Sequence, residues 1–230
     1  MKDYSRVYVA VPTRGQVDWN TVLALQEARD TYGLPPIHYQ AGRMSVSDTR
    51  AKIVQDFLAS DAEVLLSIDD DVIPHPTFPE IVQHDVDVVG CPYPMIRSLA
   101  SICVPAVFEP GVNGQAQIRR DPYGQQGLQE VYAIGTGCIA IQRRVLEHPK
   151  LKHNPFMYGF DTHGILVESD DLKFCRRVRK AGFEVYCDYS RPADHMCNGV
   201  SLWNLHSAYE AALLRVQEAQ RGAPRPIILG

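Results

Sequence analysis

The sequence of 230 residues contains no long apolar run. A bilayer crossing needs about 20 consecutive apolar residues, and no segment approaches that length. The N-terminal residues 1–6 lead directly into a strand-like run, without the apolar core of a signal peptide. We therefore expect a cytoplasmic protein with no membrane span.

Paired cysteine motifs are also absent. None of the six cysteines forms a C-x-x-C pair, which removes the usual support for a zinc ribbon or a thioredoxin-type site. A chain of this length is not the small secreted scaffold that disulfides hold together. Several cysteines lie within apolar runs, as Cys138 does, so we expect them to be reduced and buried.

The sequence lacks an excess of basic residues. Its 23 Lys and Arg against 27 Asp and Glu give a formal net charge of −4, which does not fit a general nucleic-acid binder. Two local basic runs occur, at 143–144 and 176–180. The default interpretation of each run is a solvated face. The alternative is that they bind an anionic acceptor such as DNA. The P-loop motif G-x-x-x-x-G-K-[ST] and the hydrolase motif G-x-S-x-G are both missing.

Strand-like and helix-like segments alternate through the first ninety residues. We expect strands at 7–11, 37–41, 63–68 and 86–90, with helices at 18–32, 47–59 (capped by Ser47) and 78–84. This alternation predicts a single α/β domain with a mostly parallel sheet flanked by helices. Later segments predict strands at 101–108 and 131–141, a hairpin at Asn113-Gly114, a mobile lid at 154–164, a helix from Ser169 to about 181, and a last helix over 201–221.

Three adjacent acids, Asp69-Asp70-Asp71, follow the apolar strand at 63–68. Strand periodicity would place Asp69 and Asp71 on one side, where two carboxylates suit a hard ion such as Mn²⁺ or Mg²⁺. Such an ion can neutralise a leaving diphosphate, and ligands of open α/β sheets bind at the carboxyl ends of the strands. The alternative is a solvated acidic turn.

Three further groups are candidate site residues. Asp170-Asp171 begins a helix, where the pair either stabilises the helix N-terminus or supplies a general base. His195 either completes a mixed carboxylate and imidazole metal site or is an ordinary surface or core histidine. Gly135-Thr136-Gly137 is a weak dinucleotide signature, and its glycines more readily allow a close approach of backbone to substrate.

The order of these features resembles the family 2-type glycosyltransferases of the GT-A fold, over roughly residues 7–195. Pro12-Thr13-Arg14 resembles the nucleotide-binding opening of that family, and residues 47–51 resemble the start of its second helix, although Ala51 stands where Asn is common. Residues 66–71 resemble the DxD strand, whose last Asp typically binds the metal. Residues 135–141 resemble the acceptor-side strand, and Asp170-Asp171 falls where the family carries Glu-Asp.

The resemblance implies a single GT-A (Rossmann-like) domain over residues 1–230. Residues 1–95 would bind a nucleotide sugar, residues 96–200 would bind the acceptor and carry the catalytic base, and residues 201–221 would form a C-terminal helix. The implied donor-binding residues are Pro12, Thr13, Arg14, Asp48, Arg50, Asp69 and Asp70. The implied metal ligands are Asp69, Asp71 and His195, and the catalytic residues are Asp171 and Asp170. The implied acceptor-binding residues are Gly135, Thr136, Gly137, Tyr158 and Trp203.

The implied reaction is the metal-dependent transfer of a sugar from a nucleotide diphosphate sugar, expected to be a UDP-sugar, to an acceptor hydroxyl. The compact chain also resembles phage-encoded glycosyltransferases, some of which modify hydroxymethylated bases in DNA, so such a base in the host cytoplasm is a candidate acceptor. Two alternatives remain: a nucleotidyltransferase acting on a sugar phosphate, which would release pyrophosphate, and a non-catalytic glycan- or nucleic-acid-binding module.

Overall fold

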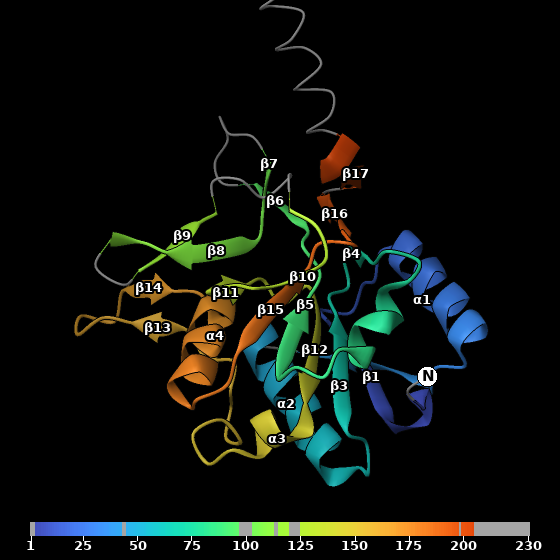
Figure 1. Ribbon diagram of the computed structural model, residues 1–230, viewed down its shortest axis with the longest axis horizontal. Helices are drawn as coiled ribbons and strands as arrows, with labels where there is room; N and C mark the ends of the chain where they lie inside the picture. The colour runs from blue at the N-terminus through green and yellow to red at the C-terminus, as the bar shows by residue number, and fades with distance from the viewer. Residues whose placement is uncertain are drawn as a thin grey trace, which may run out of the picture.

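The computed structural model describes residues 3–42, 45–96, 103–112, 115–119, 125–197 and 199–204. Its centre is a seven-stranded sheet in the order β10-β15-β5-β12-β3-β1-β2 (Figure 1). These strands are β1 (Val7–Thr13), β2 (Ile37–Ala41), β3 (Val64–Ile68), β5 (Val88–Gly90), β10 (Leu128–Glu130), β12 (Cys138–Gln142) and β15 (Val185–Asp188). Five strands run in one direction, while β10 and β12 are antiparallel to their neighbours. The expected α/β fold with a mostly parallel central sheet is confirmed.

The central strands β1 and β3 are buried on both faces, which explains their nearly continuous apolar sequences. They pair in parallel, with Val9 opposite Leu66. Because parallel strands end at the same edge, Thr13 at the end of β1 lies close to Asp69, which follows β3. This register places the two polar motifs of the sequence at the carboxyl edge of the sheet.

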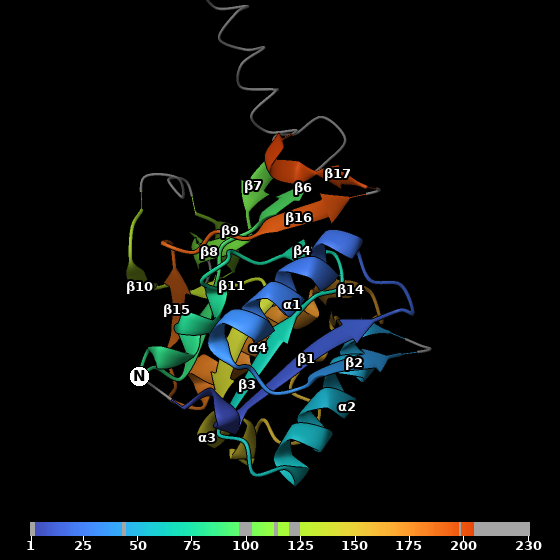
Figure 2. The same cartoon turned by 90° about the vertical axis from the view of Figure 1, so that its right-hand side faces the viewer.

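Helices cover both faces of the sheet. One buried cluster joins the sheet to α2 (Val46–Ala59), α3 (Arg143–Glu147) and α4 (Asp170–Lys180), and a second joins it to α1 (Trp19–Tyr32) and the 3₁₀ helix η2 (Phe78–Gln83) (Figure 2). A short 3₁₀ helix, η1 (Tyr4–Arg6), precedes β1. None of the described helices is long and apolar enough to cross a bilayer.

The N-terminus of α2 differs from the expectation by two residues. Ser45 is the N-cap, and its side chain accepts a hydrogen bond from the Asp48 backbone N–H. Ser47 lies in the first turn, is buried, and donates its hydroxyl to the Phe156 carbonyl. The cap therefore belongs to Ser45, because Ser47 is used in a tertiary contact that the local sequence does not reveal.

The remaining strands are short and lie outside the central sheet. They form the groups β4 (Val72–Ile73), β16 (Asp194–Cys197) and β17 (Val200–Ser201); β6 (Pro94–Ile96) and β7 (Cys103–Pro105); β8 (Val107–Pro110), β9 (Ala116–Ile118) and β11 (Ala133–Ile134); and β13 (Gly159–Phe160) and β14 (Leu166–Glu168). Figures 1 and 2 both show β6, β7, β16 and β17 above the central sheet.

Several expectations from the second half of the chain are refined. The segment 101–108 contains two strands, β7 and β8, in place of one. Strands β8 and β9 pair antiparallel around the expected hairpin, whose Asn113 and Gly114 lie outside the described residues. The region expected to be a lid, 154–164, contributes β13 to a hairpin with β14. The expected last helix is described only as far as Asn204.

The five cysteines whose side chains are described are free, and Cys91, Cys138, Cys175 and Cys187 are buried.

Candidate active site

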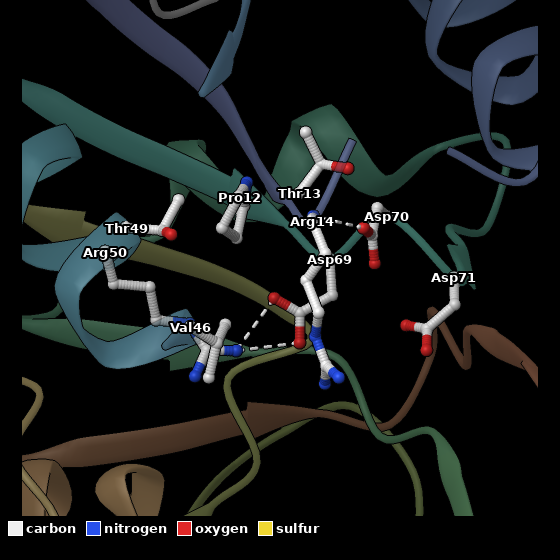
Figure 3. A pocket seen from close by; sticks show the side chains of 9 residues that line it. All are labelled: Pro12, Thr13, Arg14, Val46, Thr49, Arg50, Asp69, Asp70 and Asp71. Carbon is white, nitrogen blue, oxygen red and sulfur yellow. Dashed lines mark hydrogen bonds and ion pairs between the residues drawn. The ribbon is translucent and has the colours of Figure 1, made fainter. Parts of the chain in front are cut away.

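A pocket of about 130 Å³ opens at the carboxyl edge of the sheet (Figure 3). The end of β1, the start of α2 and the acidic turn after β3 contribute its walls. Its lining residues are Pro12, Thr13, Arg14, Val46, Thr49, Arg50, Asp69, Asp70 and Asp71. The structure thus brings together every predicted donor-binding residue except Asp48, which is exposed on α2 and accepts a hydrogen bond from Ser45.

Arg50 links the two acidic motifs of the sequence. One terminal nitrogen, Nη2, donates to both carboxylate oxygens of Asp69 at 2.7 Å, and Nη1 donates to Oδ2 of Asp170 at 2.6 Å. The Arg50 and Asp170 side chains are only 8% and 9% exposed, and that of Asp69 is 21% exposed. A single buried guanidinium thus pairs with two carboxylates that are 101 residues apart in the sequence.

The charges of this triad shift the ionisation of its members. Burial by itself lowers the pKa of Arg50, but the charges of Asp69 and Asp170 outweigh it and hold the pKa above its ordinary value. Burial raises the pKa of Asp69, although the charge and hydrogen bonds of Arg50 oppose that rise. Among the described residues, Arg50 Nε is the buried side-chain nitrogen that lacks a hydrogen-bond partner.

The three consecutive acids do not continue the strand. Strand β3 ends at Ile68, and the Val72 N–H donates to the Asp69 carbonyl at 3.2 Å, which closes a turn. The period-two argument for Asp69 and Asp71 therefore does not apply. Instead Asp69 faces Arg50, and Asp70 accepts a hydrogen bond from the Arg14 backbone N–H at 3.3 Å.

Two of the three predicted metal ligands, Asp71 and His195, lie in contact with each other. His195 Nε2 lies 3.3 Å from Asp71 Oδ2, while Nδ1 lies 2.9 Å from the Pro94 carbonyl. A carbonyl and a carboxylate both only accept, so Nδ1 donates to Pro94, and Nε2 donates to Asp71 when the imidazole is protonated. A carbonyl that fixes the tautomer of a ligand histidine is the usual outer partner in metal sites. Burial lowers the pKa of His195, but the hydrogen bond and charge of Asp71 outweigh it and raise the pKa overall.

No three His, Cys, Asp or Glu side chains of the described ranges gather as one metal-binding group. The third predicted ligand, Asp69, is occupied by Arg50. Asp71 and His195 fit a divalent cation that takes its remaining oxygen ligands from elsewhere, as Mg²⁺ does with substrate phosphates.

The second acidic pair divides into two environments at the start of α4. Asp170 is buried against Arg50. Asp171 accepts a hydrogen bond from the Ser169 hydroxyl. It accepts a second from the Leu172 backbone N–H, at 2.7 Å. Burial raises the pKa of Asp171, opposed by the Ser169 hydrogen bond and supported by the charge of Asp170. A partly buried carboxyl with a raised pKa is suited to acid–base chemistry.

Tyr93 is a site residue that the sequence analysis missed. Its ring explains the glycines at 135 and 137, because a Cβ at Gly135 would lie 2.2 Å from the Tyr93 hydroxyl oxygen and one at Gly137 would lie 2.8 Å from Cζ. The Tyr93 hydroxyl accepts a hydrogen bond from the Gly137 N–H at 3.3 Å, and the ring meets His195 edge-on at 5.6 Å. Gly135, Thr136 and Gly137 are all buried, so the close approach they permit in this structure is that of Tyr93.

Burial raises the pKa of Tyr93, and the charges of Asp171 and Asp69 raise it further. Its hydroxyl therefore lies near both acidic motifs. No local pattern in the sequence identifies Tyr93, because it becomes part of the site only when the segment after β5 packs against the Gly135–Gly137 backbone.

The other two predicted acceptor residues, Tyr158 and Trp203, have different surroundings. Burial raises the pKa of Tyr158, and the charge of Asp170 raises it further, which places this side chain next to the acidic site. Trp203 donates its indole N–H to the Ala193 carbonyl at 2.7 Å. It lines a second pocket, of about 550 Å³, together with Ile73, Pro74, His75, Pro76, Tyr189, Pro192 and Asp194.

Both basic runs are engaged in contacts within the fold. Arg143 donates to the carbonyls of Phe57, Leu58, Ser60 and Ala62 at the end of α2, and Arg144 pairs with Asp87. On α4, Arg176 pairs with Glu168, Arg179 with Glu130, and Arg177 donates to three carbonyls of 150–155. Several of these side chains remain partly exposed, as expected for solvated faces, and they also make ion pairs and hydrogen bonds within the fold.

The sheet order defines an α/β domain with a mostly parallel central sheet, and the solved structures that it matches have a GT-A-like fold. Neither a family model nor a curated protein matches this chain in sequence. A crystal structure of A197 from STIV matches with a TM-score of 0.55 and 20% identity, over 84% of this chain and 87% of that one. A crystal structure of GalNAc-T7 with UDP, GalNAc and Mn²⁺ matches with a TM-score of 0.52 and 12% identity, over 85% of this chain and 45% of that one. The chain thus spans about half of GalNAc-T7, and these likenesses show the fold.

Proposed function

We propose that this protein is a metal-dependent glycosyltransferase that moves a sugar from a nucleotide diphosphate sugar, a UDP-sugar, to an acceptor hydroxyl. The observation that carries the proposal is the convergence of β1, α2 and the acidic turn on one pocket, joined through Arg50 to the acids of α4. The shared fold adds support, because the GalNAc-T7 structure holds UDP, GalNAc and Mn²⁺.

The donor would occupy the pocket at the carboxyl edge of the sheet. Pro12, Thr13 and Arg14 would lie near the nucleoside and its phosphates, and Arg50, Asp69 and Asp70 would complete the lining of the donor pocket. Asp71 and His195 would hold Mn²⁺ or Mg²⁺, because Nε2 of His195 already faces the Asp71 carboxylate. When bound, such an ion neutralises charge on a leaving diphosphate.

The acceptor would enter from the side of α4. In an inverting transfer, Asp171 accepts the proton of the acceptor hydroxyl, and its raised pKa brings its proton affinity closer to that required at neutral pH. Asp170 has a positioning role, because its ion pair with Arg50 ties the first turn of α4 to the donor pocket. Tyr158, beside the acids, would contact the acceptor, whereas Gly135, Thr136 and Gly137 would shape this wall through Tyr93.

A hydroxymethylated base of phage DNA remains a specific acceptor to test. Because the two basic runs are already paired within the fold, DNA would have to be held by other residues. Trp203 is the last of the predicted acceptor-binding residues in the sequence. A large acceptor would also contact Trp203 and the pocket that it lines.

A panel of nucleotide sugars with Mn²⁺ tests the proposal, with simple alcohols, glycosides and hydroxymethylated DNA as acceptors and nucleoside diphosphate release as the readout. We expect release with at least one UDP-sugar, and its loss in Asp71→Ala. Asp61→Ala is the matched control, because Asp61 is exposed at the opposite end of β3. Release of pyrophosphate would instead indicate a nucleotidyltransferase, and binding without turnover would indicate a binding module.

A further inference from the structure

The β13–β14 hairpin exposes an unusual concentration of large apolar side chains. Eleven large hydrophobic residues are exposed in the described chain, and five of them fall between positions 157 and 167. They are Met157 (39% exposed), Phe160 (60%), Ile165 (62%), Leu166 (55%) and Val167 (64%). Phe160 and Leu166 lie opposite each other on the two strands, and such a grouping of exposed apolar residues marks an interaction site, unlike single exposed residues. We call residues 157–167 the apolar hairpin.

The hairpin is held in place at its base and at its tip. At the base, Arg176 makes two hydrogen bonds to the Glu168 carboxylate, at 2.8 and 2.7 Å, and Lys173 Nζ donates to the Tyr158 carbonyl at 2.7 Å. At the tip, the Asp161 carboxylate accepts from the backbone N–H groups of residues 163 and 165, at 2.8 and 2.9 Å. These bonds fix the hairpin backbone, so its apolar side chains are presented on a defined scaffold.

Both legs of the hairpin lead into the acidic site. Tyr158, beside the acids, directly precedes β13, and Asp170 follows β14 after one intervening residue. At about 3.3 Å per strand residue, Phe160 lies about 7 Å along the chain from Tyr158. Phe160 pairs with Leu166 across the hairpin, which projects beside α4 and away from the central sheet (Figure 1). A molecule lying along the hairpin would therefore have one end at Asp171.

The charges of the hairpin indicate which kind of molecule fits. Residues 157–167 contain no Lys or Arg, and their one acid, Asp161, is used at the tip. DNA and anionic membrane surfaces are both recognised through Lys and Arg, which this segment lacks. An uncharged apolar group is the complementary partner.

We propose that the apolar hairpin binds the apolar body of the acceptor, an alkyl or aryl group attached to the hydroxyl that receives the sugar. The inference rests on the proposed function and gives it an acceptor class. Phe160 and Leu166 form the centre of the surface, and the acceptor hydroxyl lies at Asp171.

Two acceptors that differ only in their apolar part provide the test. Methyl β-glucoside and octyl β-glucoside, the latter below its micelle concentration, offer the same hydroxyls. We expect a kcat/KM ratio of about ten or more in favour of octyl glucoside, from burial of a few methylene groups. Phe160→Ser/Leu166→Ser should bring that ratio toward one. Leu128→Ser, which alters an exposed leucine outside the hairpin on the edge strand β10, should leave the ratio unchanged.

The dissociation constant of octyl glucoside, measured without donor, separates this inference from the proposed function. Weaker binding by the double variant at an unchanged urea midpoint supports the hairpin site even if no nucleotide sugar is turned over. An unchanged ratio and an unchanged dissociation constant would overturn the inference. If the double variant changed only the oligomeric state, the hairpin would contact a second copy of the chain, and the inference would be overturned. It would also be overturned if the double variant lost only binding to phosphatidylcholine vesicles, because the hairpin would then contact a membrane.

Discussion

Replacing Arg50 with methionine should destabilise the protein by about 3–5 kcal/mol, because it leaves two carboxylates in the interior without a cation. Methionine is a flexible side chain that can fill much of the same space, so the lost charge dominates over the lost packing. The three hydrogen bonds removed are short, at 2.6–2.7 Å, and both partner carboxylates are largely buried.

Urea unfolding measures this loss as a shift of the midpoint at an unchanged slope. The cost should fall sharply when Arg50→Met is combined with Asp69→Asn and Asp170→Asn, because no unpaired charge then remains inside. Arg50→Lys should also destabilise, since an ammonium group lacks the planar fork that spans both acids. A loss below about 1 kcal/mol for Arg50→Met, or no recovery on neutralising both acids, would refute the buried triad as the link between the two motifs.

Three further predictions concern the surroundings of the site and the fold. Gly137→Ala should lower the free energy of unfolding by about 1–3 kcal/mol, because the added methyl group overpacks against Tyr93. In a double-mutant cycle with Tyr93→Leu, measured by urea unfolding, the combined loss should be smaller than the sum of the two single losses. Additive losses would contradict the steric explanation. Transfer rates should fall as the pH drops through the raised pKa of Asp171, because the protonated acid cannot serve as base. Initial rates measured against pH test this. If an active Asp171→Asn variant lost activity at low pH in the same way as wild type, Asp171 would not be the base. Burial alone would raise the pKa of Asp188, but hydrogen bonds from His84 and Ser190 and the charge of Arg191 lower it overall. The stability that Asp188 contributes should therefore be present above the ordinary Asp pKa of about 4 and be lost as the pH falls toward the lower pKa of Asp188 in the folded protein. Asp188→Asn should weaken the loss of unfolding free energy at low pH. An unchanged loss at low pH would assign it to other acids.

The strands that are buried on both faces could be predicted from the sequence. Residues 7–13 and 64–68 are nearly continuous apolar runs, and their burial leaves little choice of structure. The strands β13, β14, β16 and β17 were not predicted, because each has two to four residues of mixed polarity. Such segments become strands through pairing with distant partners, as β16 does with β4.

The sequence predicts which residues line the site better than it predicts which side chains they pair with. The polar residues after β1 and β3 had to share an edge once the strands were parallel, and they line one pocket. The pairing of Arg50 with Asp69 and Asp170 depends on how α2 and α4 pack, which no local pattern encodes. For the same reason, the sequence predicts that the glycines at 135 and 137 admit a substrate, whereas the group that packs against them is Tyr93.

The central claim is glycosyl transfer from a nucleotide diphosphate sugar, and product stoichiometry tests it most directly. A single reaction with UDP-sugar, Mn²⁺ and acceptor is analysed for UDP, pyrophosphate and glycosylated acceptor by mass spectrometry. The proposed function predicts equal amounts of UDP and glycosylated acceptor, no pyrophosphate, and loss of both products in Asp71→Ala while Asp61→Ala retains them. Pyrophosphate as the product, or equal yields from wild type and Asp71→Ala, would contradict the claim.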